Sequence, residues 1–176
     1  TVDGGTYATN GIGSPAIYST ANVSVANATL NSTASEGAVI EGLNTISLTN
    51  TIINNSNTEL NGNSETYKNI FIYQSMSGDA EEGTGTFIAK NSTLNESHGD
   101  NFFITNTTAK ITLENNKFNN TSDEFVFLKA ASGKWGNSDS NGGNVTLIAT
   151  NQNLKGDFVI DNVSSLSLTL EQGSYL

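Results

Sequence analysis

A short pattern of apolar and polar residues recurs along the chain, with the form apolar-x-apolar-x-Asn-x-x-apolar. Its copies begin at Val23, Ile46, Phe87, Ile111, Leu147 and Leu168, and the last copy carries Gln172 in place of the asparagine. Apolar residues at alternate positions are typical of β-strands that bury one face. The copies therefore predict a chain built from repeated strands.

The asparagine of the pattern returns at Asn27, Asn50, Asn91, Asn115 and Asn151. The shorter intervals are roughly 21 to 24 residues, and the two longer ones are one repeat plus an insertion. A regular period of this size indicates a solenoid, in which each repeat packs only on its neighbours. Ser and Thr are abundant and long runs of Ala, Leu, Glu and Lys are absent, which disfavours helical repeats.

We therefore predict an all-β fold, a single-stranded parallel β-solenoid in which residues 1–176 form one domain of about six coils. Stacked coils place equivalent residues above one another at the spacing of neighbouring strands, about 4.8 Å. The recurrent asparagines should then form a structural ladder. We expect their side chains to point inward, where an amide bonds both the backbone of the bend and the next amide.

Each coil should also contain further strands, and the longer coils should carry lateral loops. Apolar density predicts strands at residues 38–40, 69–73, 101–104, 124–128 and 158–160. The insertions fall at residues 54–67, 75–85 and 130–144. Insertions in solenoids emerge from one edge and often carry the function, so these loops are the first places to examine.

The chain resembles the right-handed parallel β-helix (pectin-lyase-like) fold. It is most similar to the repeats of adhesin-like secreted surface proteins of anaerobic bacteria and methanogenic archaea. The six copies carry this resemblance, together with Asp3-Gly4-Gly5-Thr6-Tyr7 and Gly37-Ala38-Val39-Ile40-Glu41-Gly42. It implies a right-handed coil and a secreted or cell-surface location. The same fold hosts lyases, hydrolases, adhesins and inert stalks, so the resemblance leaves the function open.

Composition and charge narrow the range of partners. The chain has 176 residues, of which 35% are hydrophobic and 14% charged, which is enough for a core. A formal net charge of −10 and a pI of about 4.2 disfavour binding to nucleic acid or to anionic membranes. Cysteine is absent, so no disulfide framework exists, and no apolar run approaches the length needed for membrane insertion.

The sequence begins and ends within repeat-like residues and does not start with Met. Complete solenoids usually carry polar caps, so we expect a fragment or a mature module of a longer protein. Uncapped ends would expose unpaired strand edges. A structural subunit that self-associates end to end into fibres is therefore one alternative function.

The resemblance also sets out what an enzyme of this fold would need. Its lyases use a basic residue, often Arg, with calcium held by Asp, but the seven basic residues of this chain are all Lys. Its hydrolases need two or three Asp on adjacent coils, where this chain carries Ser, Thr and Asn. Asp100 follows His98-Gly99, yet the companion residues are missing, and we expect His98 in a solvated turn. We predict a non-enzymatic protein without catalytic residues; a polysaccharide-active lyase or hydrolase is the second alternative.

Three aromatic residues lie in or beside the insertions: Tyr67, Tyr73 and Trp135. Flat aromatic faces pack against sugar rings, and neighbouring amides bond their hydroxyls. We therefore predict that the lateral loops bind glycans, either an extracellular polysaccharide or a glycan of a host or cell surface. The opposing interpretation is that Trp135 folds back to cover an edge of the solenoid.

One loop contains part of a calcium-binding pattern. Asn137, Asp139 and Asn141 alternate as oxygen-bearing residues before Gly142, as in the first half of a calcium loop. The position that should carry a bidentate Glu is Ile148. These three residues are the candidate metal ligands, and calcium is the only cofactor that the sequence suggests.

Overall fold

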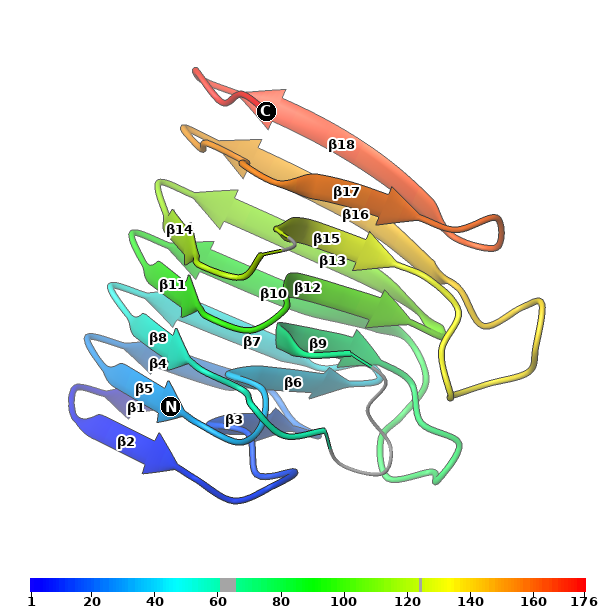
Figure 1. Ribbon diagram of the computed structural model, residues 1–176, viewed down its shortest axis with the longest axis horizontal. Coiled ribbons are helices and arrows are strands. Elements are labelled where there is room, and N and C mark those ends of the chain that lie inside the picture. The colour runs from blue at the N-terminus through cyan, green and yellow to red at the C-terminus, as the bar shows by residue number, and fades with distance from the viewer. Residues whose placement is uncertain (61–65, 124) are drawn as a thin grey trace.

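The computed structural model describes residues 1–60, 66–123 and 125–176, and every regular element in them is a β-strand. The strands form three sheets with parallel pairing throughout, and the chain winds through them as a right-handed parallel β-helix of six coils (Figure 1). This confirms the predicted fold class. Within the same residues, no helix is long and apolar enough to cross a membrane.

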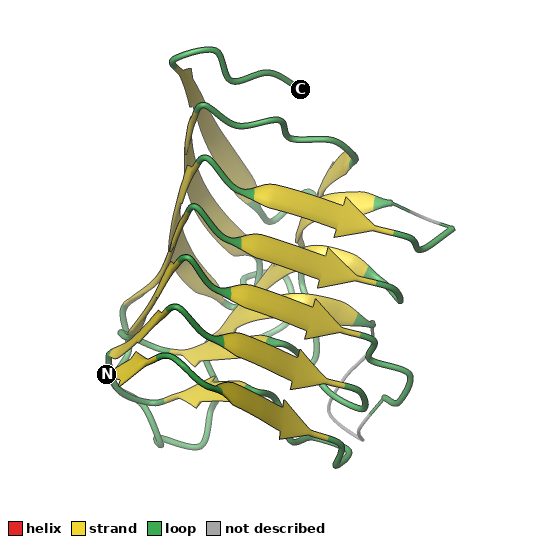
Figure 2. Cartoon of the chain, turned by 90° about the vertical axis from the view of Figure 1, so that its left-hand side faces the viewer, coloured by secondary structure: helices red, strands yellow, loops and turns green. Residues whose placement is uncertain are grey.

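Three strands, one from each sheet, make up a typical coil. Sheet A contains β1 (Val2–Asp3), β4 (Val23–Ala26), β7 (Thr45–Thr49), β10 (Thr84–Lys90), β13 (Thr107–Glu114), β16 (Gly143–Thr150) and β18 (Ser165–Glu171). Sheet B, whose stacked strands face the viewer in Figure 2, contains β2 (Thr6–Thr9), β5 (Thr29–Ser32), β8 (Ile52–Asn55), β11 (Thr93–Glu96) and β14 (Lys117–Asn120). Sheet C contains β3 (Ile17–Ser19), β6 (Ala38–Glu41), β9 (Lys68–Tyr73), β12 (Asp100–Thr105), β15 (Val126–Ala130) and β17 (Asp157–Ile160).

The alternating apolar residues of the repeat fill the interior of the coil. Leu48 of β7 pairs with Val25 on one side and Ala89 on the other, and all three are buried. Phe102 and Phe127 reach the same core from sheet C, with ring centroids 5.6 Å apart. Parallel pairing in register thus turns the periodic pattern into continuous apolar columns, whose burial drives folding.

The expected strands are confirmed within one or two residues, with β6, β9, β12, β15 and β17 at the five apolar segments. The expected insertion at 54–67 begins later, because β8 continues to Asn55. Residues 61–65 of that insertion, and Glu124 at the start of the expected strand 124–128, lie outside the described residues.

The asparagine ladder exists, but the prediction that it points inward is wrong. Asn27, Asn50, Asn91, Asn115 and Asn151 are exposed and have φ between 48° and 54°. Amide-to-amide bonds of 2.8–3.3 Å link Asn50 to Asn27, Asn115 to Asn91 and Asn151 to Asn115. Asn tolerates the left-handed backbone region better than other residues with a side chain. The bend therefore selects Asn for its backbone conformation, and the outward ladder follows.

The inward ladder lies one residue later in each repeat. The backbone N–H of Thr51 donates to Ser92 Oγ, and that of Ser92 donates to Asn116 Oδ1, at 3.1 and 2.9 Å. The backbone N–H of Asn116 donates to Gln152 Oε1 at 2.9 Å, and that of Gln152 to Ser174 Oγ at 3.0 Å. These four bends thus have a buried N–H satisfied by a side chain of the next coil, which is the role expected for the asparagines.

Candidate functional site

The outer face of sheet C is apolar, unlike an ordinary solvated sheet face. Parallel register aligns Tyr18, Val39, Phe71 and Phe103 in one outward column. Val39, Phe71 and Phe103 are at most 7% exposed although they point away from the interior of the coil. With Tyr73 and Ala131 they form a second hydrophobic cluster outside the helix, and Trp135 packs against it. We call this group of residues the outer cluster.

Stacked rings dominate the outer cluster. The rings of Phe71 and Tyr73 are nearly parallel, with centroids 4.5 Å apart, and Phe71 and Phe103 are stacked at 5.6 Å. Trp135 lies 5.3 Å from Tyr73 at an interplanar angle of 45°. Aromatic packing of this kind adds to the gain from burial and holds the rings in a defined geometry.

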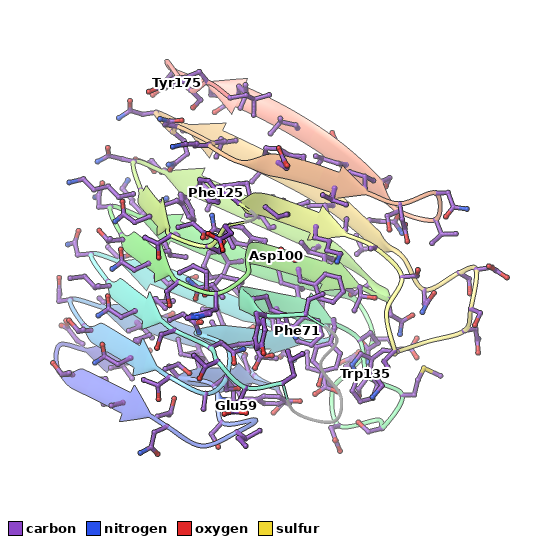
Figure 3. All side chains as sticks on the ribbon, in the orientation of Figure 1. Glu59, Phe71, Asp100, Phe125, Trp135 and Tyr175 are labelled. Carbon is purple, nitrogen blue, oxygen red and sulfur yellow. The ribbon has the colours of Figure 1, made fainter. Side chains whose placement is uncertain are left out.

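Two insertions approach this face, one between β9 and β10 and one between β15 and β16 (Figure 1). Figure 3 shows Trp135 on the side of the molecule where both loops emerge. The Asn141 side chain donates to the backbone carbonyls of Gly133 and Trp135, both at 2.7 Å. The backbone carbonyl of Asn141 accepts the backbone N–H of Asn106 at 2.8 Å. These bonds tie the Trp135 loop to the body of the helix.

A buried ion pair borders the outer cluster. Lys68 Nζ lies 3.1 Å from Glu36 Oε1, and the two side chains are 1% and 6% exposed. The same ammonium lies 4.5 Å from the centroid of the Phe71 ring, a cation–π distance. Burial would raise the pKa of Glu36, but the charge of Lys68 and a bond from Ser35 outweigh it, so the pKa is lowered. Glu36 is therefore held ionised.

A second carboxylate, that of Glu41, accepts hydrogen bonds from two tyrosines. The hydroxyls of Tyr18 and Tyr73 lie 2.9 Å apart, and both hydrogen-bond Glu41 Oε2, Tyr73 at 3.3 Å. Glu41 is 1% exposed, and its Oε1 has no hydrogen-bond partner in the described part of the chain. Burial and the neighbouring carboxylate raise the pKa of Tyr18 to about 12, and the pKa of Tyr73 is raised as well. Both tyrosines therefore stay protonated.

These groups surround a hollow of about 310 Å³, which we call the sheet C hollow. Its wall combines aromatic faces, hydroxyls and carboxylates. The lining residues are Gly13, Pro15, Tyr18, Glu36, Val39, Glu41, Phe71, Tyr73, Ser75, Ser77, Asp79 and Trp135. An apolar concave surface with a few polar groups converging on it is the usual form of a small-ligand site.

Of the predicted binding residues, Trp135 and Tyr73 meet in the sheet C hollow, whereas Tyr67 lies elsewhere. Tyr67 contacts His98 edge-on, with ring centroids 6.5 Å apart, and lines another hollow with Asp100 and Lys129. It follows that two of the three aromatic residues belong to one site. The fold-back interpretation also holds in part, because Trp135 packs on the outer cluster as well as lining the hollow.

The three candidate metal ligands differ in their surroundings. Asn137 and Asp139 are exposed at the tip of the loop, and Asp139 has φ 66°. Asn141 is 4% exposed, and its amide nitrogen is engaged in holding the Trp135 loop. In the described residues, no group of three or more His, Asp or Glu side chains is placed to hold a metal ion. Calcium binding by these three residues stays a prediction.

The residues considered for catalysis are dispersed. Asp100 begins β12 and is 8% exposed. His98 is exposed, and its Nδ1 lies 3.1 Å from Ser97 Oγ, in agreement with a turn residue. Asp139, the other aspartate whose replacement would test for an enzyme, belongs to a different loop, between β15 and β16.

Sequence reasoning missed Tyr18, Glu36, Glu41 and Lys68 as site residues. They come from three successive coils, and the unequal insertions hide their alignment in the sequence. Comparisons of the chain with protein-family models, with curated proteins and with solved structures gave no match. The site must therefore be interpreted from its own chemistry.

Proposed function

We propose that the protein is a non-enzymatic, adhesin-like β-helix module of a microbial cell surface or secreted assembly that binds glycans in the sheet C hollow. The observation that supports this most is the position of Trp135, 5.3 Å from Tyr73 at the wall of a hollow that also holds hydroxyl and carboxylate groups. A sugar needs both features, an apolar ring face to pack against and polar groups for its hydroxyls.

The surroundings of the aromatic residues favour a rigid recognition surface. Trp135 is held by the Asn141 bonds, and Tyr73 is stacked on Phe71 and bonded through its hydroxyl. Tyr18 is 50% exposed and lines the hollow, so its ring is open to a ligand. Binding to groups that are already ordered loses little side-chain entropy, which favours affinity for weakly binding sugars.

Binding to a panel of soluble and insoluble polysaccharides, with and without calcium, tests the proposal. We expect at least one polysaccharide to bind, and Trp135→Ala to weaken that binding by about tenfold or more. Tyr175→Ala is the matched control, because Tyr175 is exposed and does not line the hollow. Folded protein that binds no polysaccharide would overturn the proposal and favour a structural stalk or fibre subunit.

A polysaccharide hydrolase is the second candidate. Glu41 and Asp79 line the same hollow, and glycoside hydrolysis uses two carboxyl groups on either side of the scissile bond. Release of reducing ends from a bound polysaccharide, abolished by Asp79→Asn, would establish this activity. Binding without any release would leave the non-enzymatic proposal standing.

A further inference from the structure

The charges around the sheet C hollow are unbalanced. Three carboxylates line it, from Glu36, Glu41 and Asp79. Lys68 pairs with Glu36, but no ion pair forms to Glu41 or Asp79 within the part of the chain that the structure describes. The formal charges of two carboxylates are therefore uncompensated next to the aromatic wall. Such a site attracts a cation and repels an anion.

Of these two carboxylates, the buried one of Glu41 gives the stronger evidence for a cationic ligand. A charge at 1% exposure normally has a cation or a full set of hydrogen bonds, and Oε1 of Glu41 has neither in the described residues. Glu36, on the same side of the sheet, shows the usual solution with Lys68 beside it. The counter-charge that Glu41 lacks within the chain can be supplied by a ligand.

Tyr18 links the Glu41 carboxylate to the hollow, because it bonds Glu41 and also lines the hollow. Its hydroxyl donates to Glu41 Oε2 and accepts from the Tyr73 hydroxyl at 2.9 Å, which leaves one lone pair of the phenol oxygen as an acceptor. The negative charges of Glu41 and Asp79 both help to keep this phenol protonated, and the same field favours a cation near its oxygen. Asp79 is exposed and can pair with such a cation directly.

We propose that the hollow selects a protonated amino sugar, with its ammonium group between the Tyr18 hydroxyl and the Asp79 carboxylate and its ring against Trp135. This deepens, and rests on, the glycan-binding function proposed above. Aromatic faces also attract ammonium groups, so the wall of the hollow adds to the effect of the carboxylates. An N-acetylated sugar lacks the charge and leaves the carboxylates uncompensated.

Binding of glucosamine trimer and N-acetylglucosamine trimer to the full chain tests the inference. Trp135 is the only tryptophan, so its fluorescence follows the titration. Short oligomers at about 0.15 M salt limit general attraction to the acidic surface. We expect the amine form to bind about tenfold or more tightly, which is the effect of one charge-assisted contact. The preference should disappear above about pH 8, where such amines lose their proton.

Three variants locate the preference. Asp79→Asn, at an exposed position, and Glu41→Gln should each reduce the amine preference several-fold. Glu171→Gln is the control, since it removes the same charge from an exposed position on β18. Should Glu41→Gln fail to fold, the exposed Asp79 position still carries the test. An amine preference that persists in Asp79→Asn and Glu41→Gln would reflect the overall charge and would overturn the inference.

The remaining outcomes separate this inference from the proposed function. Equal binding of the two trimers would overturn amine recognition and leave glycan binding in place. If neither trimer binds but another polysaccharide from the panel does, amine recognition is likewise overturned and glycan binding stays in place. Failure of every glycan tested would overturn both.

Discussion

The outer faces of sheets A and C come from the same coils, yet they differ in character. On sheet A the outward positions include Ser24, Ser47 and Thr112, which water reaches at least in part, and the ion pair there, Lys90 with Glu114, is nearly half exposed. On sheet C the equivalent face carries the rings of Phe71, Tyr73 and Phe103, each at most 7% exposed. The same β-helix thus has an ordinary solvated face on sheet A and a second packed layer on the outside of sheet C.

The difference arises from the connections between strands. Short bends join sheet A to sheet B, with only Asn27 and Ala28 between β4 and β5. Longer segments leave sheet C after β9 and β15, and one of them carries Trp135 onto the outer cluster. A sheet face becomes a candidate site where its loops are long enough to cover outward apolar residues and leave a hollow between them.

The largest effect should appear when the sheet C face loses its buried cation, Lys68. Lys68→Ala leaves the carboxylate of Glu36 buried without its partner, and we expect a loss of about 3–5 kcal/mol in the free energy of unfolding. Urea denaturation monitored by circular dichroism measures it. A loss below about 1 kcal/mol would show that Glu36 is solvated in the folded protein and that the two faces are alike.

Glu96 is a buried carboxylate that, unlike Glu36, forms no ion pair within the described residues. Burial raises the pKa of Glu96 from 4.5 to about 8. The folded protein then holds this proton more tightly than the unfolded chain does, so the free energy of unfolding falls as the pH rises from about 4.5 to about 8.

The variant Glu96→Gln removes that dependence. We expect it to match the parent near pH 5 and to be more stable by a few kcal/mol near pH 9, by urea denaturation at both pH values. Glu59→Gln, at an exposed position, is the control. Equal stability of Glu96→Gln and the parent at about pH 9 would mean that Glu96 ionises without penalty.

A smaller effect is expected at the bends between sheets A and B. Asn50 has φ 48°, so Asn50→Leu should destabilise the fold by about 1 kcal/mol through backbone strain. Asn50→Gly should change the thermal midpoint little, because glycine accepts this conformation. Equal destabilisation by both changes would show that the outward amide bonds, rather than the backbone, hold the bend.

The smallest effect should come from the exposed ion pair of sheet A. Lys90 and Glu114 are 2.8 Å apart, but their side chains are 49% and 44% exposed. We expect Lys90→Ala to change the free energy of unfolding by less than about 0.5 kcal/mol. A loss comparable to that of Lys68→Ala would remove the distinction between the faces.

Much of the fold could be predicted because its pattern is local. Alternation at Ile46 and Leu48 identifies a strand, and the recurrent Asn marks the bend that follows. The inward direction of the Asn could not be obtained in this way. Simple alternation places Asn50 inward, but its left-handed backbone turns the chain, so Asn50 faces solvent and Thr51 faces the core. Strand alternation does not continue through a residue with positive φ.

A second ladder was present in the repeat and was missed. Asn31, Asn54, Asn95 and Asn119 each follow the inward apolar residue of sheet B, and their amides are linked by bonds of 2.7–2.8 Å. The signal was an Asn four residues after the bend in four of the six repeats. A pattern extended by one position would have contained it.

The candidate site could be predicted only in part, because it joins distant coils. Trp135 and Tyr73 could be predicted as site residues because they are aromatic residues in or beside insertions. Tyr18 and Glu41 depend on the register between coils of unequal length. A local signal did exist, since consecutive apolar residues such as Ile70, Phe71 and Ile72 indicate a strand buried on both faces.

The sheet C hollow also limits how such a protein can change in length. A solenoid tolerates the duplication or deletion of whole coils, since each coil contacts only its neighbours. Here Tyr18, Glu41 and Tyr73 stand on three successive coils, and Trp135 reaches back to Tyr73 from a later one. Gain or loss of a coil among them would preserve the core and dismantle the hollow. The core therefore places little limit on the number of coils, whereas the hollow requires these particular coils to stay adjacent.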